Sequence, residues 1–336
     1  MAVSPSLEIS ERLQQLVQAE WQRSVPDAVK QVAADISARY QGQVQAVLFY
    51  GSCLRTGIVK DKILDFYVLV DDYSQAYQKK WLAWANKLIP PNVFYHEMMV
   101  DGVVVRSKYA VISVEDFKER VQPDCLNVSI WARFCQPCVP LLLKSDPIAE
   151  LIQQSTVQAC VTMLGHAVPM CYQGSGDPQG GVISAEDHWS TAFNLTYASE
   201  VRSEPEGKGR EIYAVDSDRY DAFYPELLPL IKAQKDLFLL GKNVPVSKSE
   251  MIDIDDVDHL QKISRKLWAR RARNGKLLSI LRLIKASMTF DGGIDYLAWK
   301  IGRHSGVQIE VTDKMRRFPI ISGLYVYFKM RGKAFK

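Results

Sequence analysis

The sequence lacks long hydrophobic runs and has few cysteines. None of its 336 residues lies in a run of eighteen consecutive apolar residues, so no membrane-spanning helix is predicted. Its six cysteines are scattered, and the one C-x-x-C pair, Cys135 and Cys138, has no second pair to complete a zinc site. We expect both thiols to be buried, and we expect neither a disulfide framework nor secretion.

The chain as a whole also lacks a large excess of charge of either sign. The net charge is only +4, so bulk electrostatics give no reason to expect a nucleic-acid partner. Basic residues gather in two places instead: residues 262–285 hold nine Lys and Arg and no acid, and residues 313–336 hold seven against one acid. An apolar content of 47% and a charged content of 24% are ordinary for a soluble globular chain of one or two domains.

The hydrophobic pattern changes character near residue 145. Before that point amphipathic helices alternate with short β-rich runs, which predicts a mixed α/β sheet over residues 1–145. The expected strands cover residues 43–50, 63–70, 92–100, 103–113 and 139–143. Asp101-Gly102 is a strong turn signal and should join the third and fourth strands as a hairpin.

Helices are expected around these strands. They cover residues 7–40 with a break at Pro26, residues 74–89 and residues 128–135. In the second of these helices four apolar residues recur on one stripe, namely Tyr77, Trp81, Trp84 and Leu88. We expect that stripe to be part of the core rather than an exposed stacking surface.

Beyond residue 145 almost the whole pattern is helical. The expected helices cover residues 147–170, 187–202, 220–240, 259–273, 276–288 and 294–304. A short strand at residues 307–311 would make residues 146–312 a winged-helix-like domain. Residues 313–336 form a basic segment with an apolar, aromatic centre, which suits an anionic membrane surface. A C-terminal helix docked on the protein is the alternative.

The most informative stretch runs from Val47 to Arg55 and is followed by the strand expected at Ile63–Val70. It predicts a buried strand, a tight Gly51-Ser52 turn that opens a short helix, and a second strand that carries Asp65. Glycine lets a backbone approach phosphate closely, and a serine hydroxyl with free N–H groups binds phosphate oxygens. A strand carboxylate suits Mg²⁺, which prefers oxygen ligands. Nucleotidyltransferases of the polymerase-beta type hold a triphosphate in this way; an ordinary strand-turn-strand is the alternative.

One carboxylate of the usual pattern is absent. Such sites commonly carry Asp-x-Asp, which places both carboxylates on one face of the strand, but here the second position is Tyr67. Glu97, on the third expected strand, is the candidate for a second oxygen ligand, with an outward-facing hairpin carboxylate as the alternative. Lys108, on the fourth strand, would meet phosphate as a point charge or be a solvated strand lysine.

Several segments, taken in order, resemble the mitochondrial-type phosphatidate cytidylyltransferases (the translocator assembly and maintenance protein family) and their bacterial relatives. The clearest matches are Tyr50-Gly51-Ser52, Leu64-Asp65-Phe66 and Lys108-Tyr109-Ala110-Val111-Ile112-Ser113. The run Trp131-Ala132-Arg133-Phe134-Cys135-Gln136-Pro137-Cys138-Val139 also looks like a family segment, and a weaker match is Thr196-Tyr197-Ala198-Ser199-Glu200-Val201-Arg202. The chain departs from the family pattern at Ala110 and Ala132, where glycine is usual, and at Gln136, where lysine is usual.

The resemblance implies transfer of CMP from CTP to phosphatidic acid, which gives CDP-diacylglycerol and pyrophosphate with Mg²⁺ as cofactor. It also implies a nucleotidyltransferase domain, a winged-helix-like domain and a membrane-binding C-terminal segment. Residues 1–25 carry three glutamates and few arginines, unlike a signal or transit peptide. We therefore expect a bacterial cytoplasmic protein, peripheral on the inner face of the cell membrane.

The strand-turn-strand motif, the predicted neighbouring strands and the resemblance together predict roles for individual residues. The implied nucleotide-binding residues are Tyr50, Gly51, Ser52, Arg55, Glu200 and Arg202. The implied catalytic residues are Asp65 and Lys108, and the expected metal ligands are Asp65 and Glu97.

Two other classes of function stay open. Tyr67 is compatible with a degenerate nucleotidyltransferase that acts as a nucleotide-binding scaffold. A nucleotidyltransferase acting on RNA would place Arg270, Arg271 and Arg273 on the RNA backbone. Another lipid phosphate or a polar phosphate also stays open as the acceptor. Since Trp268 is the single aromatic residue of that basic stretch, no stacking series exists and no nucleic-acid partner is expected.

Overall fold

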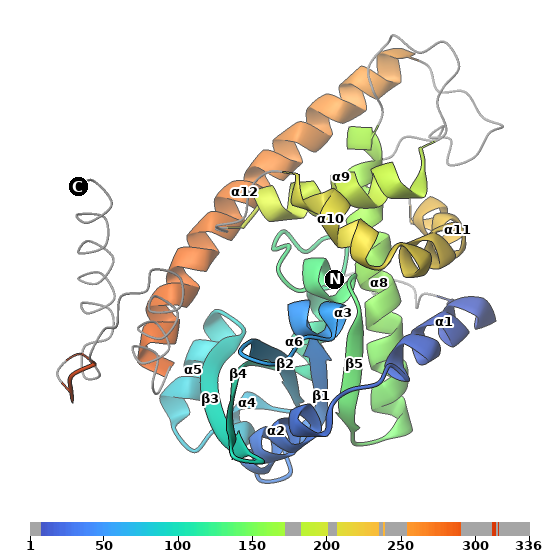
Figure 1. Cartoon of the computed structure of the whole chain (residues 1–336). Coiled ribbons are helices and arrows are strands. Elements are labelled where there is room, and N and C mark those ends of the chain that lie inside the picture. The colour runs from blue at the N-terminus through green and yellow to red at the C-terminus, as the bar shows by residue number, and fades with distance from the viewer. Residues whose placement is uncertain are drawn as a thin grey trace, which may run out of the picture.

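The computed structural model describes residues 8–171, 183–200, 207–234, 238, 254–289, 311–313 and 315. Figure 1 shows a sheet flanked by short helices, with longer helices stacked beside and above it. The predictions that fall on residues 294–304, on 307–311 apart from residue 311, and on 313–336 apart from residues 313 and 315 lie outside the described residues, and so does Arg202.

A five-stranded mixed sheet forms the first part of the chain. Its strands are β1 (Val44–Tyr50), β2 (Ile63–Val70), β3 (Asn92–Val100), β4 (Val103–Ser113) and β5 (Cys138–Leu143), in the spatial order β3-β4-β2-β1-β5. The β2–β4 pair is parallel and the other three pairs are antiparallel. The predicted mixed sheet is therefore confirmed, and the Asp101-Gly102 turn has positive φ at both residues, as a two-residue hairpin requires.

Short helices surround the sheet. They are α1 (Glu11–Trp21), α2 (Asp27–Ala38), α3 (Ser52–Thr56), α4 (Tyr73–Ala76), α5 (Lys80–Leu88), α6 (Val114–Glu119) and α7 (Trp131–Phe134). Pro26 separates α1 from α2 as predicted, since proline fits the start of a helix but not its interior. Ser113 caps α6 by accepting a hydrogen bond from the Asp116 N–H.

The two faces of the sheet belong to two separate hydrophobic clusters. Alternate residues such as Phe49 and Phe66 pack on one face, which α2, α4 and α5 cover. Leu48 and Tyr67 pack on the other face, against α7 and the long helix α8 (Asp146–Cys171). Because side chains alternate along a strand, Asp65 lies on the same face as Tyr67, toward the helical part of the molecule.

Helices make up the described structure beyond residue 145. After α8 come α9 (Ala185–Ala198), α10 (Lys208–Val215), α11 (Ser217–Ala233) and α12 (Ile254–Thr289). Among the described residues, no helix is both long and apolar enough to cross a bilayer. Cys135 and Cys138 are free and fully buried, as predicted.

The two helices predicted over residues 259–273 and 276–288 are a single helix, and that prediction was wrong. The two predicted ranges left Asn274 and Gly275 between them, but α12 runs through both residues. A Cβ at Gly275 would lie 2.0 Å from the carbonyl oxygen of Ser199. The glycine therefore serves close packing of α12 against the end of α9, not a turn.

The helix predicted over residues 74–89 is also corrected. The chain is extended at Tyr77, which separates α4 from α5. Of the stripe expected in the core, Tyr77 is buried, whereas Trp81, Trp84 and Leu88 are 41%, 67% and 62% exposed. The break turns those three side chains away from the sheet, while Leu82 and Ala83 pack against it.

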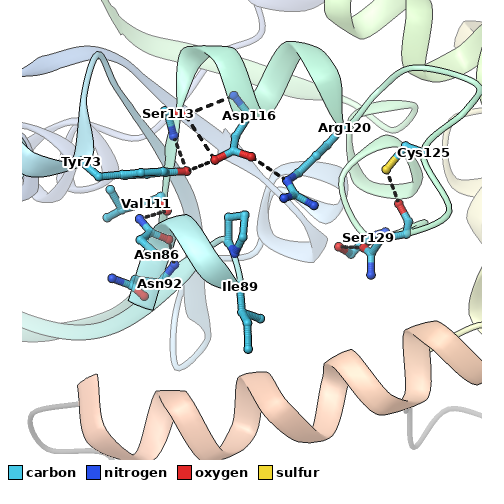
Figure 2. A network of polar contacts seen from close by, with 12 residues as sticks. Tyr73, Asn86, Ile89, Asn92, Val111, Ser113, Asp116, Arg120, Cys125 and Ser129 are labelled. Carbon is cyan, nitrogen blue, oxygen red and sulfur yellow. Dashed lines mark hydrogen bonds and ion pairs between the residues drawn. The ribbon is translucent and has the colours of Figure 1, made fainter. Parts of the chain in front are cut away.

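The end of α12 is anchored on the turn that follows α5. The Arg282 guanidinium donates to the Pro90 carbonyl at 2.7 Å and to the Ser129 hydroxyl at 2.9 Å. The Lys285 ammonium donates to the carbonyls of Ile89 and Pro91. Figure 2 shows Ile89 pointing from the end of α5 toward this helix. The sheet and the last long helix are thus joined by basic side chains that bind backbone carbonyls.

Candidate functional site

The turn between β1 and α3 has a backbone conformation that favours glycine. Gly51 has φ 90° and ψ −162°, a region that other residues adopt only with strain. Ser52 follows at the first position of α3 and is exposed. The Cys53 thiol donates to the Ile63 carbonyl at 3.3 Å and so ties α3 to the start of β2. The serine hydroxyl therefore projects from a turn that is fixed on both sides.

Asp65 lies directly against this turn. In the sheet it pairs with Tyr50 on one side and Lys108 on the other. A Cβ on Gly51 would be 2.8 Å from Asp65 Oδ2, so the carboxylate occupies the space that any other residue at position 51 would need. The sequence predicted that the glycine turn and the strand aspartate belong to one site, and the structure brings them into contact.

Lys108 forms an ion pair with Asp65 across the parallel strands. Its Nζ lies 3.1 Å from Asp65 Oδ1, and its side chain is 44% exposed while that of Asp65 is 15% exposed. The contact lacks hydrogen-bond geometry, which leaves the buried Oδ1 atom without a hydrogen bond. A partly solvated cation beside a buried carboxylate can meet a phosphate without leaving the site.

Glu97 is not brought to Asp65. The residue of β3 that pairs with Lys108 is Tyr95, whereas Glu97 pairs with Arg106, two residues further along each strand. Its carboxylate accepts hydrogen bonds from the Tyr95 hydroxyl and from Arg106 Nε, the latter at 3.0 Å. Glu97 is therefore two strands away from Asp65 and held by the hairpin, so its predicted role as a metal ligand has no geometric support here.

Tyr67, the residue that stands where the second carboxylate would be, lies in an aromatic cluster on the same face of β2 as Asp65. Its ring centroid is 5.0 Å from that of Phe134 and 5.2 Å from that of Tyr50. Burial raises the pKa of Tyr67 above its usual value, although the cations of Arg133 and Arg282 act against that rise. Burial likewise raises the pKa of Tyr50. Both phenols therefore stay protonated and can donate hydrogen bonds.

Arg133 and Glu200 form an ion pair next to these phenols. The Arg133 Nη1 atom lies 3.1 Å from Glu200 Oε1 and also donates to the Ser129 carbonyl. Burial acts to lower the pKa of Arg133, but the adjacent Glu200 carboxylate and the phenols of Tyr67 and Tyr50 outweigh it and raise the pKa, so this cation is permanent. The structure thus places Glu200, predicted from the sequence as a nucleotide-binding residue, within electrostatic reach of Tyr67.

Arg55 lies on the helical side of the site. Its Nη1 donates to Gln136 Oε1 at 2.5 Å, and Gln136 Nε2 donates to the Ala132 carbonyl at 2.8 Å. Gln136 therefore orients a neighbouring arginine, so that α3 supplies a cation at this edge of the site.

Arg133 and Arg282 are the residues that sequence reasoning missed. Arg133 belongs to a segment that carried the resemblance, but nothing in its local pattern marked it as part of the site. Arg282 is one of nine basic residues over 262–285, and only the docking of α12 shows that it lies within electrostatic reach of Tyr67. Periodicity could identify the basic face of this helix but not its neighbour in space.

Among the described residues of this site, Asp65 is a suitable protein ligand for a magnesium ion. The described part of the chain contains no group of three or more His, Cys, Asp or Glu side chains that could hold a metal ion. Asp65 Oδ1 is nevertheless a buried oxygen without a hydrogen bond. Since Mg²⁺ is commonly held by one or two carboxylates together with substrate phosphates and water, the residues present fit an ion that arrives with a triphosphate.

Comparison with known proteins gives little beyond this geometry. No protein-family model matches the chain, and no curated protein matches it. Among solved structures, the chain is similar to a nucleotidyltransferase-like protein from Exiguobacterium sibiricum 255-15, with 11% sequence identity and a TM-score of 0.26 over 91% of this chain and 92% of that one.

Proposed function

We propose that the protein is a nucleotidyltransferase that transfers CMP from CTP to phosphatidic acid and releases pyrophosphate. The observation that carries the proposal is the contact between the Gly51 turn and the Asp65 carboxylate, with Lys108 paired to the same carboxylate. A glycine-serine turn, a largely buried carboxylate and a partly solvated cation within one site are the groups that a triphosphate and its metal require.

The reaction forms one phosphorus–oxygen bond and breaks another. An oxygen of the acceptor phosphate attacks the α-phosphorus of the nucleotide, and the bond from that phosphorus to the bridging oxygen of the β-phosphate breaks. Pyrophosphate leaves with the electron pair. The protein has little covalent chemistry to perform, because positioning and charge neutralisation account for most of the catalysis in such transfers.

Each residue of the site has a part in that positioning. The Ser52 hydroxyl would hold the terminal phosphates together with the backbone at Gly51, which phosphate can approach closely because glycine has no side chain. Lys108 would turn from Asp65 to the triphosphate and neutralise developing charge, while Arg55 would balance charge at the helical edge. Asp65 would hold Mg²⁺, which supplies charge neutralisation for the leaving pyrophosphate when bound.

The acceptor and the base are proposed on the resemblance of the sequence segments. Lys108, the first residue of the segment Lys108-Tyr109-Ala110-Val111-Ile112-Ser113, pairs with Asp65 in the sheet. The segment then runs along β2 as far as Ser113, which pairs with Val70, so the matching segment contributes Lys108 to the site. Phosphatidic acid would also require a membrane-bound enzyme. The basic segment 313–336, which we propose as a membrane contact on the cytoplasmic face of a bacterial membrane, lies almost entirely outside the described residues.

The test is incubation of the full chain with each of the four nucleoside triphosphates, Mg²⁺ and phosphatidic acid vesicles, scored for pyrophosphate and lipid product. We expect product with CTP and loss of turnover in Asp65→Asn, with unchanged folding by circular dichroism. Asp71→Asn is the matched control, because Asp71 is exposed just beyond the opposite end of β2. A folded Asp65→Asn protein with full activity would remove this assignment.

A nucleotide-binding scaffold is the second candidate, and Tyr67 favours it. The position that would carry the second metal carboxylate is filled by a ring packed between Tyr50 and Phe134. Titration calorimetry with CTP and Mg²⁺, followed by a pyrophosphate assay on the same sample, separates the two functions. Tight binding without pyrophosphate release in the presence of each candidate acceptor would favour the scaffold.

A further inference from the structure

The helix α5 presents two tryptophans to solvent. Trp81 and Trp84 are 41% and 67% exposed, and Leu88 on the same face is 62% exposed. The spacing of three and four residues places the three side chains side by side on one face of the helix. Tryptophan side chains are large and mostly buried in folded proteins, so two neighbouring exposed ones mark a surface built to meet something apolar.

The opposite face of α5 explains why these side chains cannot turn inward. Leu82 and Ala83 pack against the sheet, and the Asn86 side chain is buried, donating to the Val111 carbonyl at 2.9 Å. The side-chain oxygen Oδ1 of Asn86 accepts from the Asn92 backbone N–H at 2.6 Å. Because these contacts fix the rotation of the helix, the exposure of Trp81 and Trp84 is a property of the fold.

Positive charge surrounds the exposed tryptophans. Lys79, Lys80 and Lys87 are all exposed on or beside α5. From residue 73 to residue 96 the chain has these three lysines and no aspartate or glutamate. Asp72, which caps α4, lies within electrostatic reach of Lys87 and lowers the local positive charge without cancelling it. The combination of tryptophan and lysine on one exposed helix is complementary to an anionic lipid headgroup layer.

We propose that α5 is a membrane-docking surface, on which Trp81, Trp84 and Leu88 enter the headgroup region of an anionic bilayer and the flanking lysines contact lipid phosphates. Tryptophan is enriched at this depth because its ring is apolar and its indole N–H remains hydrogen-bonded. The surface is separate from the site at Asp65, and the inference does not depend on the proposed catalytic activity.

Vesicle co-sedimentation of the full chain tests the proposal. The probes are vesicles of equal parts phosphatidylglycerol and phosphatidylcholine, compared with vesicles of phosphatidylcholine alone. We expect Trp81→Gln/Trp84→Gln to bind the anionic vesicles at least about tenfold more weakly than the unaltered protein. The matched control is Met99→Gln/Val215→Gln, which removes two apolar side chains of 62% and 52% exposure from elsewhere on the surface and should change binding less than twofold.

The lysines are tested by their dependence on salt. Replacing Lys79, Lys80 and Lys87 by glutamine should weaken binding to anionic vesicles by up to about fivefold per lysine, and flatten its salt dependence. Binding to phosphatidylcholine vesicles should change little. Equal binding of this variant and the unaltered protein at low salt would contradict the assigned role of the lysines.

Fluorescence locates the contact on α5. Brominated lipids quench tryptophans that enter the bilayer, and among the described tryptophans Trp21, Trp131, Trp189 and Trp268 are buried or partly buried. We expect quenching in the unaltered protein and its loss in Trp81→Phe/Trp84→Phe. Unchanged vesicle binding and unchanged quenching in the Trp81 and Trp84 variants would overturn the proposal.

Two other occupants of this surface give distinct results. If residues 313–336 of the same chain cover α5, the tryptophan variants will bind vesicles as the unaltered protein does. If a second copy covers it, the Trp81→Gln/Trp84→Gln variant will elute later in size-exclusion chromatography without vesicles. Either result counts against membrane docking by α5, and neither depends on whether CTP is turned over.

Discussion

Glu20 of α1 and Arg219 of α11 are 199 residues apart in the chain and form a buried ion pair, with side chains only 2% and 4% exposed. Glu20 also accepts from the Cys138 backbone N–H at 2.9 Å, and Arg219 donates to the Cys135 carbonyl at 3.0 Å. The pair thus links the first helix, the last sheet strand and the helical part of the molecule through fully desolvated groups.

Removing one partner of this pair should be strongly destabilising. We expect Glu20→Gln to lower the free energy of unfolding by about 3–5 kcal/mol, because Arg219 keeps its charge without a compensating carboxylate. Chemical denaturation measures the change. The double variant Glu20→Leu/Arg219→Met should be more stable than Glu20→Gln, since it leaves no unpaired charge. Equal stability of Glu20→Gln and the unaltered protein would show that the pair is not buried in solution.

Gly51→Ala should harm both stability and activity. The backbone conformation at Gly51 costs about 1–3 kcal/mol for a residue with a side chain. Its Cβ would also press on Asp65 Oδ2 at 2.8 Å. Thermal unfolding and CTP turnover are the measurements. Gly57→Ala is the matched control: Gly57 also has positive φ, at 68°, but nothing lies within 4 Å of its Cβ. We expect the control to share a stability loss and retain turnover.

We expect Gly275→Ala to destabilise the protein, whereas replacing glycine by alanine usually stabilises a helix. In a free helix alanine is more favourable than glycine by about 1 kcal/mol. Here the new Cβ would lie 2.0 Å from the Ser199 carbonyl oxygen, so we expect a lower melting temperature. Since Ser199 precedes Glu200, the displacement should also disturb the Glu200–Arg133 ion pair at the site. Asn274→Ala is the neighbouring control and should be neutral or slightly stabilising; a rise in melting temperature for Gly275→Ala would contradict the packing.

Acid should destabilise the protein through its buried histidines. His188 Nε2 donates to the Leu164 carbonyl, and its Nδ1 faces the Tyr224 hydroxyl, so the ring is held neutral. Burial lowers the pKa of His188 to about 4 and that of His166 to about 3. Between about pH 6.5 and 4 the unfolded chain binds a proton at each position and the folded chain does not, so stability falls as pH falls.

The slope of that decline is the quantity to measure. Each buried histidine should contribute up to about 1.4 kcal/mol per pH unit within this window. His188→Gln should be less stable at pH 7 because it loses packing and hydrogen bonds. Its unfolding free energy should nevertheless fall less steeply with acid than that of the unaltered protein. Parallel slopes for the two proteins would mean that His188 is protonated in the folded state.

Sequence reasoning was most successful where local chemistry decides the outcome. The bounds of β2, β3 and β4 were predicted to the residue, because alternating or continuous apolar runs end at Pro90-Pro91 and at Asp101-Gly102. The placement of Gly51 beside Asp65 also followed from the order strand, turn, strand. These features depend on propensities and short-range geometry, which a single sequence carries.

Tertiary packing decided the features that the sequence left open or suggested wrongly. Gly275 is a helix breaker by propensity, and only the Ser199 carbonyl pressed against it explains a continuous α12. Trp81 and Trp84 look like core residues until the rotation of α5 is fixed by Asn86. Likewise, strand register places Tyr95 rather than Glu97 opposite Lys108. The amino-acid sequence determined which elements form, whereas the distance between elements far apart in the chain depended on how their faces pack together.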